Sequence, residues 1–403
     1  MRIGFIAVKS VLRGGGIETY TYEVGRRMVA LGHEVIVFSM GHYGDVPELV
    51  QGMRVVKVPC LPGAATERIT ASMSGVVYAL MQQPRLDILH LHTPMTGVFG
   101  IIPVLLGFTT VVQMHGIDWQ RSRWGRVARS TIRGMEHTVM RFMPNCTAVS
   151  KTQISFYEKT YGRRLPMIPT GAQSHQIDAR TDEIKKLGLV SGNYILFMSR
   201  LVPEKGAHFL ISAFRNLTTD LKLVIGGETI LSDPYTRSLI GLAGGDDRIV
   251  FSGFVGGELK HQLLSNAGFY VQPSAIEGLS IALLEAMSYC IPCLASDIPE
   301  NIEAIGKTGL TFANGNVDDL RSRINEMLTH REECKRLAAN GRDRVLQEFS
   351  WDKVTGMLLE LYRHCLGERN TTQPNRGFTG RLTKMILGQQ HRKLPLIERQ
   401  LPT

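Results

Sequence analysis

Cysteine is scarce in this chain and follows no binding pattern. Six cysteines are spread over 403 residues, and only Cys290 and Cys293 lie close together. A structural zinc site takes four ligands, and neither a second cysteine pair nor a histidine cluster accompanies this one. Both cysteines lie in an apolar run, which favours buried thiols. Free cysteines without a disulfide framework indicate a reducing compartment, so we expect a cytoplasmic protein without a metal site.

The sequence also lacks a secretion signal and a continuous membrane-spanning run. The apolar residues 1–8 are too few for a signal peptide and end at Lys9, so they predict a first strand. Residues 93–114 contain no Asp, Glu, Lys or Arg and would be long enough to span a bilayer. Prolines and glycines interrupt this run, which therefore predicts a buried helix followed by a buried strand.

Acidic residues are outnumbered by basic ones, which gives a net charge of +10 and favours a polyanionic partner. A hydrophobic content of 43% and a charged content of 20% are typical of a globular protein, and the length allows two domains. Strand and helix patterns alternate through residues 1–172 and start again at 191, after the polar segment 173–190, which we interpret as a linker. The basic tail 369–403 is either disordered or attached to a membrane or an acidic partner.

The first domain opens with a strand, a glycine-rich loop and a helical pattern. This order is typical of a nucleotide-binding βα unit, but the G-x-G-x-x-G spacing of dinucleotide-binding enzymes is missing. Gly15 and Gly16 could let the backbone approach a phosphate, or they could form only a mobile turn. Later, His90 and His92 share one face of a predicted strand, and neutral histidines are favoured there over metal ligands.

Polar and basic residues follow the strand predicted to end at residue 114. His115 and Asp118 come directly after it, at the edge where open α/β sheets bind their ligands. The segment Trp119–Arg141 then combines six arginines with Trp119 and Trp124. We interpret it as a basic helix with aromatic anchors that lies on an anionic membrane surface. A solvated face or a nucleic-acid site are the alternatives, because a basic patch does not distinguish polyanions.

In the second domain, Arg200 and Lys205 stand in a loop between a strand and a helix. Together they could bind a diphosphate through the guanidinium fork of Arg200 and the ammonium group of Lys205. Alternatively, they could belong to an ordinary surface loop.

The stretch 276–285, I-E-G-L-S-I-A-L-L-E, predicts a loop and then a helix. Gly278 permits the turn and Ser280 is a suitable N-cap. A helix start favours phosphate, whereas Glu277 and Glu285 suit hydroxyl groups, and a nucleotide-sugar carries both. The alternative is that both glutamates flank a core helix at the surface.

In this order, the glycine loop, His115-Gly116, the Arg200–Lys205 loop and the Glu277–Glu285 stretch resemble family 4 of the retaining glycosyltransferases. The resemblance covers residues 1–366. It implies the GT-B architecture, an α/β fold in which two Rossmann-like parallel-sheet domains face each other across a cleft. Residues 1–172 would bind the acceptor, residues 191–350 would bind the nucleotide-sugar, and a helix at 351–366 would cross back to the first domain.

The resemblance also implies roles for single residues. Glu285 would hold the ribose hydroxyls, and Glu277 would lie against the transferred sugar and the pyrophosphate. Arg200 and Lys205 would neutralise the diphosphate in place of a metal ion, and His115 would contact the donor sugar near the reaction centre. The remaining residues expected to bind substrate are Gly15, Gly16, Asp118, Gly278, Leu279 and Ser280.

The expected activity is that of a metal-independent retaining hexosyltransferase without a cofactor. Its partners would be a nucleotide-sugar donor, a glycan or lipid-linked acceptor and an anionic membrane surface, with no nucleic acid. Synthesis of a capsule, O-antigen or exopolysaccharide is the expected context. Leu279 and Ser280 replace the aromatic residue and glycine common in the family, which leaves the donor sugar and base open. A nucleotide-sugar epimerase and a non-catalytic basic adaptor are the alternatives.

Overall fold

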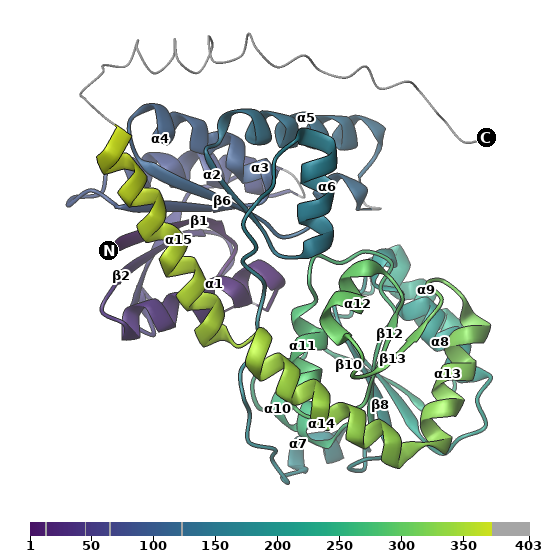
Figure 1. The fold of residues 1–403 in the computed structure, drawn as a ribbon. Coiled ribbons are helices and arrows are strands. Elements are labelled where there is room, and N and C mark those ends of the chain that lie inside the picture. The colour runs from purple at the N-terminus through teal and green to yellow at the C-terminus, as the bar shows by residue number, and fades with distance from the viewer. Residues whose placement is uncertain (13, 45, 64–65, 122–123, 373–403) are drawn as a thin grey trace.

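The computed structural model describes residues 1–12, 14–44, 46–63, 66–121 and 124–372. They form two α/β lobes, one built on a seven-stranded sheet and the other on a six-stranded sheet (Figure 1). The expected α/β class with two parallel-sheet domains is confirmed.

The N-terminal sheet has the strand order β3-β4-β2-β1-β5-β6-β7. All neighbours are parallel except β3, which pairs antiparallel with β4 at one edge. The central strands are apolar on both faces because helices cover both sides of the sheet. The strands are β1 (Arg2–Val8), β2 (Glu34–Met40), β3 (Leu49–Val50), β4 (Met53–Val58), β5 (Ile88–His92), β6 (Thr109–Met114) and β7 (Asn145–Ala148).

Helices α2, α3, α4 and α5 cover one face of this sheet, and α1 lies on the other (Figure 1). The single buried helix expected after residue 93 is instead three short segments, because prolines and glycines interrupt the run. Within the described ranges, no helix is both long and apolar enough to cross a bilayer. The helices are α1 (Gly16–Ala30), α2 (Thr66–Leu80), α3 (Pro94–Gly97), α4 (Ile101–Leu105), α5 (Arg126–Phe142) and α6 (Lys151–Tyr161), with the 3-10 turns η1 (Val98–Gly100) and η2 (Asp118–Gln120).

The C-terminal sheet is parallel throughout, with the order β10-β9-β8-β11-β12-β13. Its strands are β8 (Tyr194–Met198), β9 (Lys222–Gly226), β10 (Ile249–Gly253), β11 (Phe269–Gln272), β12 (Cys293–Ser296) and β13 (Leu310–Phe312). Its helices are α7 (Asp182–Lys186), η3 (Pro203–Lys205), α8 (Ala207–Arg215), α9 (Pro234–Ala243), α10 (Gly257–Asn266), α11 (Ile281–Ser288), α12 (Pro299–Ile305), α13 (Val317–Thr329) and α14 (Arg331–Glu348).

Two segments join the lobes. Residues 173–181 have no regular structure, whereas α7, still within the expected linker, packs Ile184 into the core of the C-terminal lobe. The last helix, α15 (Trp351–Thr372), runs back across the N-terminal lobe (Figure 1). Its Leu358 and Tyr362 are fully buried in the core beside α1 and β1, and each such side chain contributes about 1.5–3 kcal/mol. The expected returning helix is therefore present and continues past residue 366. Residues 373–403, most of the expected tail, lie outside the described residues.

The expected basic helix Trp119–Arg141 is wrong in its first part. Trp119 lies in η2, and α5 begins only at Arg126. Trp124 is 7% exposed and packs with Met95 and Ile132, while Trp119 is partly buried against the same cluster. Trp124 cannot be a membrane anchor because its ring fills the space between α3 and α5.

Candidate active site

A cavity of about 990 Å³ lies between the two lobes. It opens at the carboxyl ends of β1, β5 and β6 on one side and of β8, β9 and β11 on the other, where open parallel sheets bind ligands. All the residues predicted from the sequence as catalytic or substrate-binding line it. They are Gly15, Gly16, His115, Asp118, Arg200, Lys205, Glu277, Gly278, Leu279, Ser280 and Glu285.

The loop between β11 and α11, together with α11 itself, supplies the two glutamates, as the strand, loop and helix pattern predicted. Ser280 caps α11, since its side chain accepts a hydrogen bond from the backbone N–H of Leu283 at 3.3 Å. Glu277 therefore stands in the loop before the cap, and Glu285 lies within α11 on the side that faces the cavity.

Glu277 is fixed by a buried ion pair. Its Oε1 lies 2.5 Å from Nζ of Lys205, at the end of η3, and 2.8 Å from Nε2 of Gln272, which also donates to it. Both charged side chains are about nine-tenths buried. Burial lowers the pKa of Lys205, and the nearby carboxylate of Glu277 opposes that shift. The pair therefore keeps a cation and an anion together at the floor of the cavity.

Arg200 is exposed in the cavity and, among the described residues, has no recorded hydrogen bond or ion pair. Arg68 of α2 lines the cavity from the opposite lobe. Lys205 is already paired with Glu277, whereas these two guanidinium groups form no hydrogen bond or ion pair with the described residues. The cavity thus has a polar end that suits an anionic ligand such as a diphosphate.

Two further side chains of the cavity were not predicted from the sequence. Lys260 of α10 places Nζ 2.7 Å from Oε1 of Glu285. Arg121 pairs its Nε with Oδ1 of Asp118 at 3.0 Å. Lys260 lies within α10, so no local signal marks it. Arg121 follows β6 in the same loop as His115 and Asp118, but the sequence assigned it to a basic helix on a membrane surface.

The lobes approach closely at Gly278. A Cβ on Gly278 would lie 2.1 Å from the backbone oxygen of His115, so only glycine fits against this backbone. Beside it, the hydroxyl of Thr170 donates to the backbone oxygen of Leu279 at 2.9 Å. These contacts tie the glutamate loop to the N-terminal lobe and place His115 next to it.

His115 is partly buried, and burial lowers its pKa to about 3, with Arg68 and Arg121 adding to the shift. Its ring is therefore neutral at physiological pH. The glycine loop lies on the same lobe, and α1 begins at Gly16. Gly16 lines the cavity, and a Cβ there would meet nothing within 4 Å. Free backbone N–H groups at this helix start suit a phosphate.

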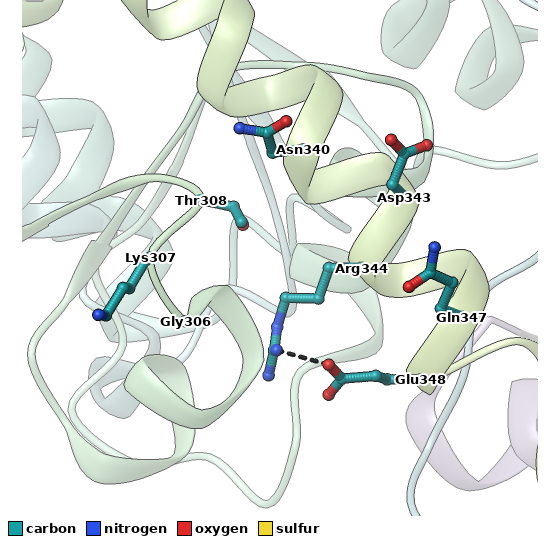
Figure 2. A pocket seen from close by; sticks show the side chains of 8 residues that line it. All are labelled: Gly306, Lys307, Thr308, Asn340, Asp343, Arg344, Gln347 and Glu348. Carbon is teal, nitrogen blue, oxygen red and sulfur yellow. Dashed lines mark hydrogen bonds and ion pairs between the residues drawn. The ribbon is translucent and has the colours of Figure 1, made fainter.

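A smaller hollow of about 500 Å³ lies between the end of α12 and α14 (Figure 2). Its Arg344 pairs with Glu348 at 2.8 Å and donates to the backbone oxygens of Ala304 and Glu303. The guanidinium is already occupied by contacts that hold α14 against α12, so the hollow offers no chemistry comparable to that of the large cavity. In the part of the chain that the structure describes, no group of three or more His, Cys, Asp or Glu side chains could hold a metal ion.

Comparison with known proteins places these features in a family. Residues 14–175 match the family described as Glycosyltransferase Family 4, and residues 179–344 match Glycosyl transferases group 1. The chain is 25% identical to an MMP alpha-(1->4)-mannosyltransferase of Mycolicibacterium hassiacum, over 91% of this chain and 98% of that protein. It is 26% identical to a GDP-mannose-dependent alpha-(1-6)-phosphatidylinositol monomannoside mannosyltransferase of Mycobacterium tuberculosis, over 87% and 95% of the two chains.

Solved structures show the same fold. Sucrose-phosphate synthase of Thermosynechococcus elongatus superposes with a TM-score of 0.79 at 19% identity, over 91% of this chain and all of that one. Anabaena HepE in complex with UDP and glucose gives a TM-score of 0.74 at 20% identity, over 89% and 98%. The fold is therefore the expected GT-B architecture. This chain belongs to glycosyltransferase family 4, whose members transfer a sugar from a nucleotide-sugar donor without a metal cofactor.

Proposed function

We propose that this enzyme transfers a hexose to an acceptor hydroxyl with retention of the anomeric configuration. The observation that carries the proposal is the arrangement of charged side chains on one wall of the cavity. Arg200 and the Lys205–Glu277 pair lie at one part of it, and the Lys260–Glu285 pair lies at another. A nucleotide-sugar has an anionic diphosphate between two groups rich in hydroxyls, which matches this alternation of cations and carboxylates.

In the proposed complex, Glu285 accepts hydrogen bonds from the ribose hydroxyls. Lys260 orients the carboxylate of Glu285 through Oε1, so its second oxygen stays available. Arg200 and Lys205 donate to the diphosphate oxygens, and the backbone at Gly16 closes on the phosphates from the other lobe. Each charge-assisted hydrogen bond of this kind is worth about 1.5–3 kcal/mol.

The bond between the anomeric carbon and the diphosphate oxygen breaks, and the electron pair leaves with the diphosphate. Arg200 and Lys205 stabilise the negative charge that develops there. The acceptor oxygen attacks the same face of the sugar, and its proton passes to the departing phosphate. Glu277 is a poor nucleophile because one of its oxygens already accepts from Lys205 and Gln272. This supports front-face attack without a covalent intermediate on the enzyme.

We also propose that the enzyme meets its acceptor at an anionic membrane, which the outer face of the N-terminal lobe would bind. Helices α2, α3, α4 and α5 lie on this side of the sheet (Figure 1), and their only carboxylates, Glu67 and Glu136, are buried. Four exposed arginines and several exposed apolar side chains remain, a combination that suits anionic lipids. They are Arg126, Arg129, Arg133, Arg141, Met73, Val77, Ile102, Leu106 and Val127. A lipid-linked acceptor in polysaccharide synthesis would meet the enzyme at such a surface.

A donor screen tests the proposed reaction. The protein is incubated in EDTA with GDP-, UDP- and ADP-hexoses and alkyl glycoside acceptors. Mannosyl donors are tested first, because two of the relatives are named as mannosyltransferases. We expect one donor class to give a product in which the anomeric configuration of the donor, read by proton NMR, is kept. We also expect the matching nucleoside diphosphate to raise the melting temperature. An inverted product would overturn retention, and hydrolysis or rearrangement without transfer would overturn the acceptor reaction.

A further inference from the structure

A short chain of hydrogen bonds runs from helix α1 to the cavity. His92, the last residue of β5, is 1% exposed, and its Nδ1 lies 2.9 Å from Nε2 of His115. The other ring nitrogen of His92, Nε2, lies 3.1 Å from Oγ1 of Thr21, which is fully buried on α1. Thr21, His92 and His115 are thus linked in series, and His115 lines the cavity.

The two rings are held in fixed planes. Phe5 stacks on His92 with an interplanar angle of 5°, and Tyr20 stands edge-on to His115 with ring centroids 5.1 Å apart. Burial lowers the pKa of His92 well below its usual value, and the pKa of His115 is lowered in the same way. Both rings are therefore neutral, with one N–H and one lone pair each, and the hydrogen bonds of the series must all point in one direction.

The hydroxyl of Thr21 sets that direction. Among the described residues its only recorded hydrogen bond is to His92, whereas Thr131 and Thr138 on α5 donate to backbone oxygens four residues earlier. A buried hydroxyl without an acceptor would cost about 1–3 kcal/mol, so the Thr21 hydroxyl donates to Nε2 of His92. His92 then carries its proton on Nδ1 and donates to Nε2 of His115. The proton of His115 is consequently on Nδ1.

We propose that Thr21 and His92 are positioning residues that hold His115 as a hydrogen-bond donor at Nδ1. In the described part of the chain, Nδ1 of His115 has no recorded partner, and the residue faces the cavity. It therefore donates to an oxygen of the bound ligand, a sugar hydroxyl or a phosphate oxygen, and does not act there as a base. The catalytic consequence rests on the proposed function, but the position of the proton does not.

Nitrogen-15 NMR of the full-length protein labelled at histidine measures the position of the proton directly. The pattern of ring nitrogen shifts and two-bond couplings distinguishes the two neutral tautomers, and a His115→Gln variant assigns the signals of His115. We expect the Nδ1–H form for His92 and for His115 in the wild type. An Nε2–H form of His115 would overturn the inference.

Matched variants test the role of Thr21. Thr21→Val keeps the shape but removes the donor, so His115 should become a mixture of tautomers, and kcat/KM should fall about tenfold, the equivalent of one hydrogen bond. Thr21→Ser keeps the hydroxyl and should restore both the Nδ1–H form and the activity. An unchanged His115 tautomer in Thr21→Val would refute the role of Thr21. If the tautomers behave as expected while the wild type transfers no sugar, the inference stands and the proposed function fails.

Discussion

Replacing Gly278 with alanine tests how closely the two lobes must meet. The new Cβ would lie 2.1 Å from the backbone oxygen of His115, whereas real Cβ contacts are essentially never under 3.0 Å. The backbone of His115 cannot rotate away as a flexible side chain would, so the loop carrying Glu277 must retreat by roughly 1 Å. A displacement of about 1 Å at a catalytic centre costs on the order of 100-fold in rate, because reacting groups lose their alignment.

The assay is steady-state kinetics of sugar transfer, with the melting temperature measured in parallel. We expect kcat/KM of Gly278→Ala to fall about 100-fold, with most of the loss in kcat, because the shift separates the two lobes around the reacting sugar. The matched control is Gly241→Ala on α9, where a Cβ meets nothing within 4 Å. The control should keep its activity and gain about 0.4–1 kcal/mol in the free energy of unfolding.

Wild-type activity in Gly278→Ala, together with an unchanged melting temperature, would show that the glutamate loop does not pack against His115 as described. The reasoning would also fail if Gly241→Ala lost as much activity as Gly278→Ala. The loss would then follow from replacing any glycine with alanine and not from a clash between the lobes.

Three other predictions concern charge. Lys205→Ala should lower kcat by roughly 100- to 1000-fold, because the leaving diphosphate loses a cation, while binding to anionic vesicles stays unchanged; equal loss of both would contradict the separation of the two surfaces. Replacing both Arg129 and Arg133 with serine should weaken binding to phosphatidylserine-containing vesicles by about 2 kcal/mol, or roughly 30-fold, with no change for purely zwitterionic vesicles. Unchanged vesicle binding would show that α5 does not contact the membrane. Burial lowers the pKa of His90 to about 3. Between pH 6.5 and 3 the unfolded chain therefore binds a proton at His90 that the folded chain does not. The free energy of unfolding consequently falls as the pH decreases through this range. His90→Phe should reduce that slope by about 1.4 kcal/mol per pH unit in denaturant titrations, and an unchanged slope would show that His90 titrates normally.

The sequence predicted the parts of the site that stand in loops directly after strands. Arg200, Lys205 and Glu277 each follow a buried apolar strand, and the carboxyl ends of parallel strands meet at one edge of a sheet. The local pattern placed them at such an edge but left ordinary surface loops open, and the resemblance to family 4 brought them together in one expected site. Ser280 was equally predictable, because a serine before an apolar helical run is a common N-cap.

Other features depend on contacts that no local pattern encodes. Lys260 and Arg68 lie within helices, and they reach the cavity only because of how each helix packs on its sheet. Trp124 was misjudged for a related reason. An aromatic residue beside arginines fits a membrane anchor and a core equally well, and only the position of α3 shows that Trp124 fills an internal space.

Binding of a nucleoside diphosphate in the presence of EDTA tests most directly whether side-chain cations of the cleft hold the anionic end of the donor. Titration calorimetry compares the wild type with Arg200→Gln, which keeps a polar side chain but removes the charge. We expect the wild type to bind without free divalent metal and the variant to bind at least about tenfold more weakly, since a charge-assisted hydrogen bond contributes about 1.5–3 kcal/mol. Equal affinity of the two proteins, or binding that requires added metal, would contradict the claim that side-chain cations hold the diphosphate.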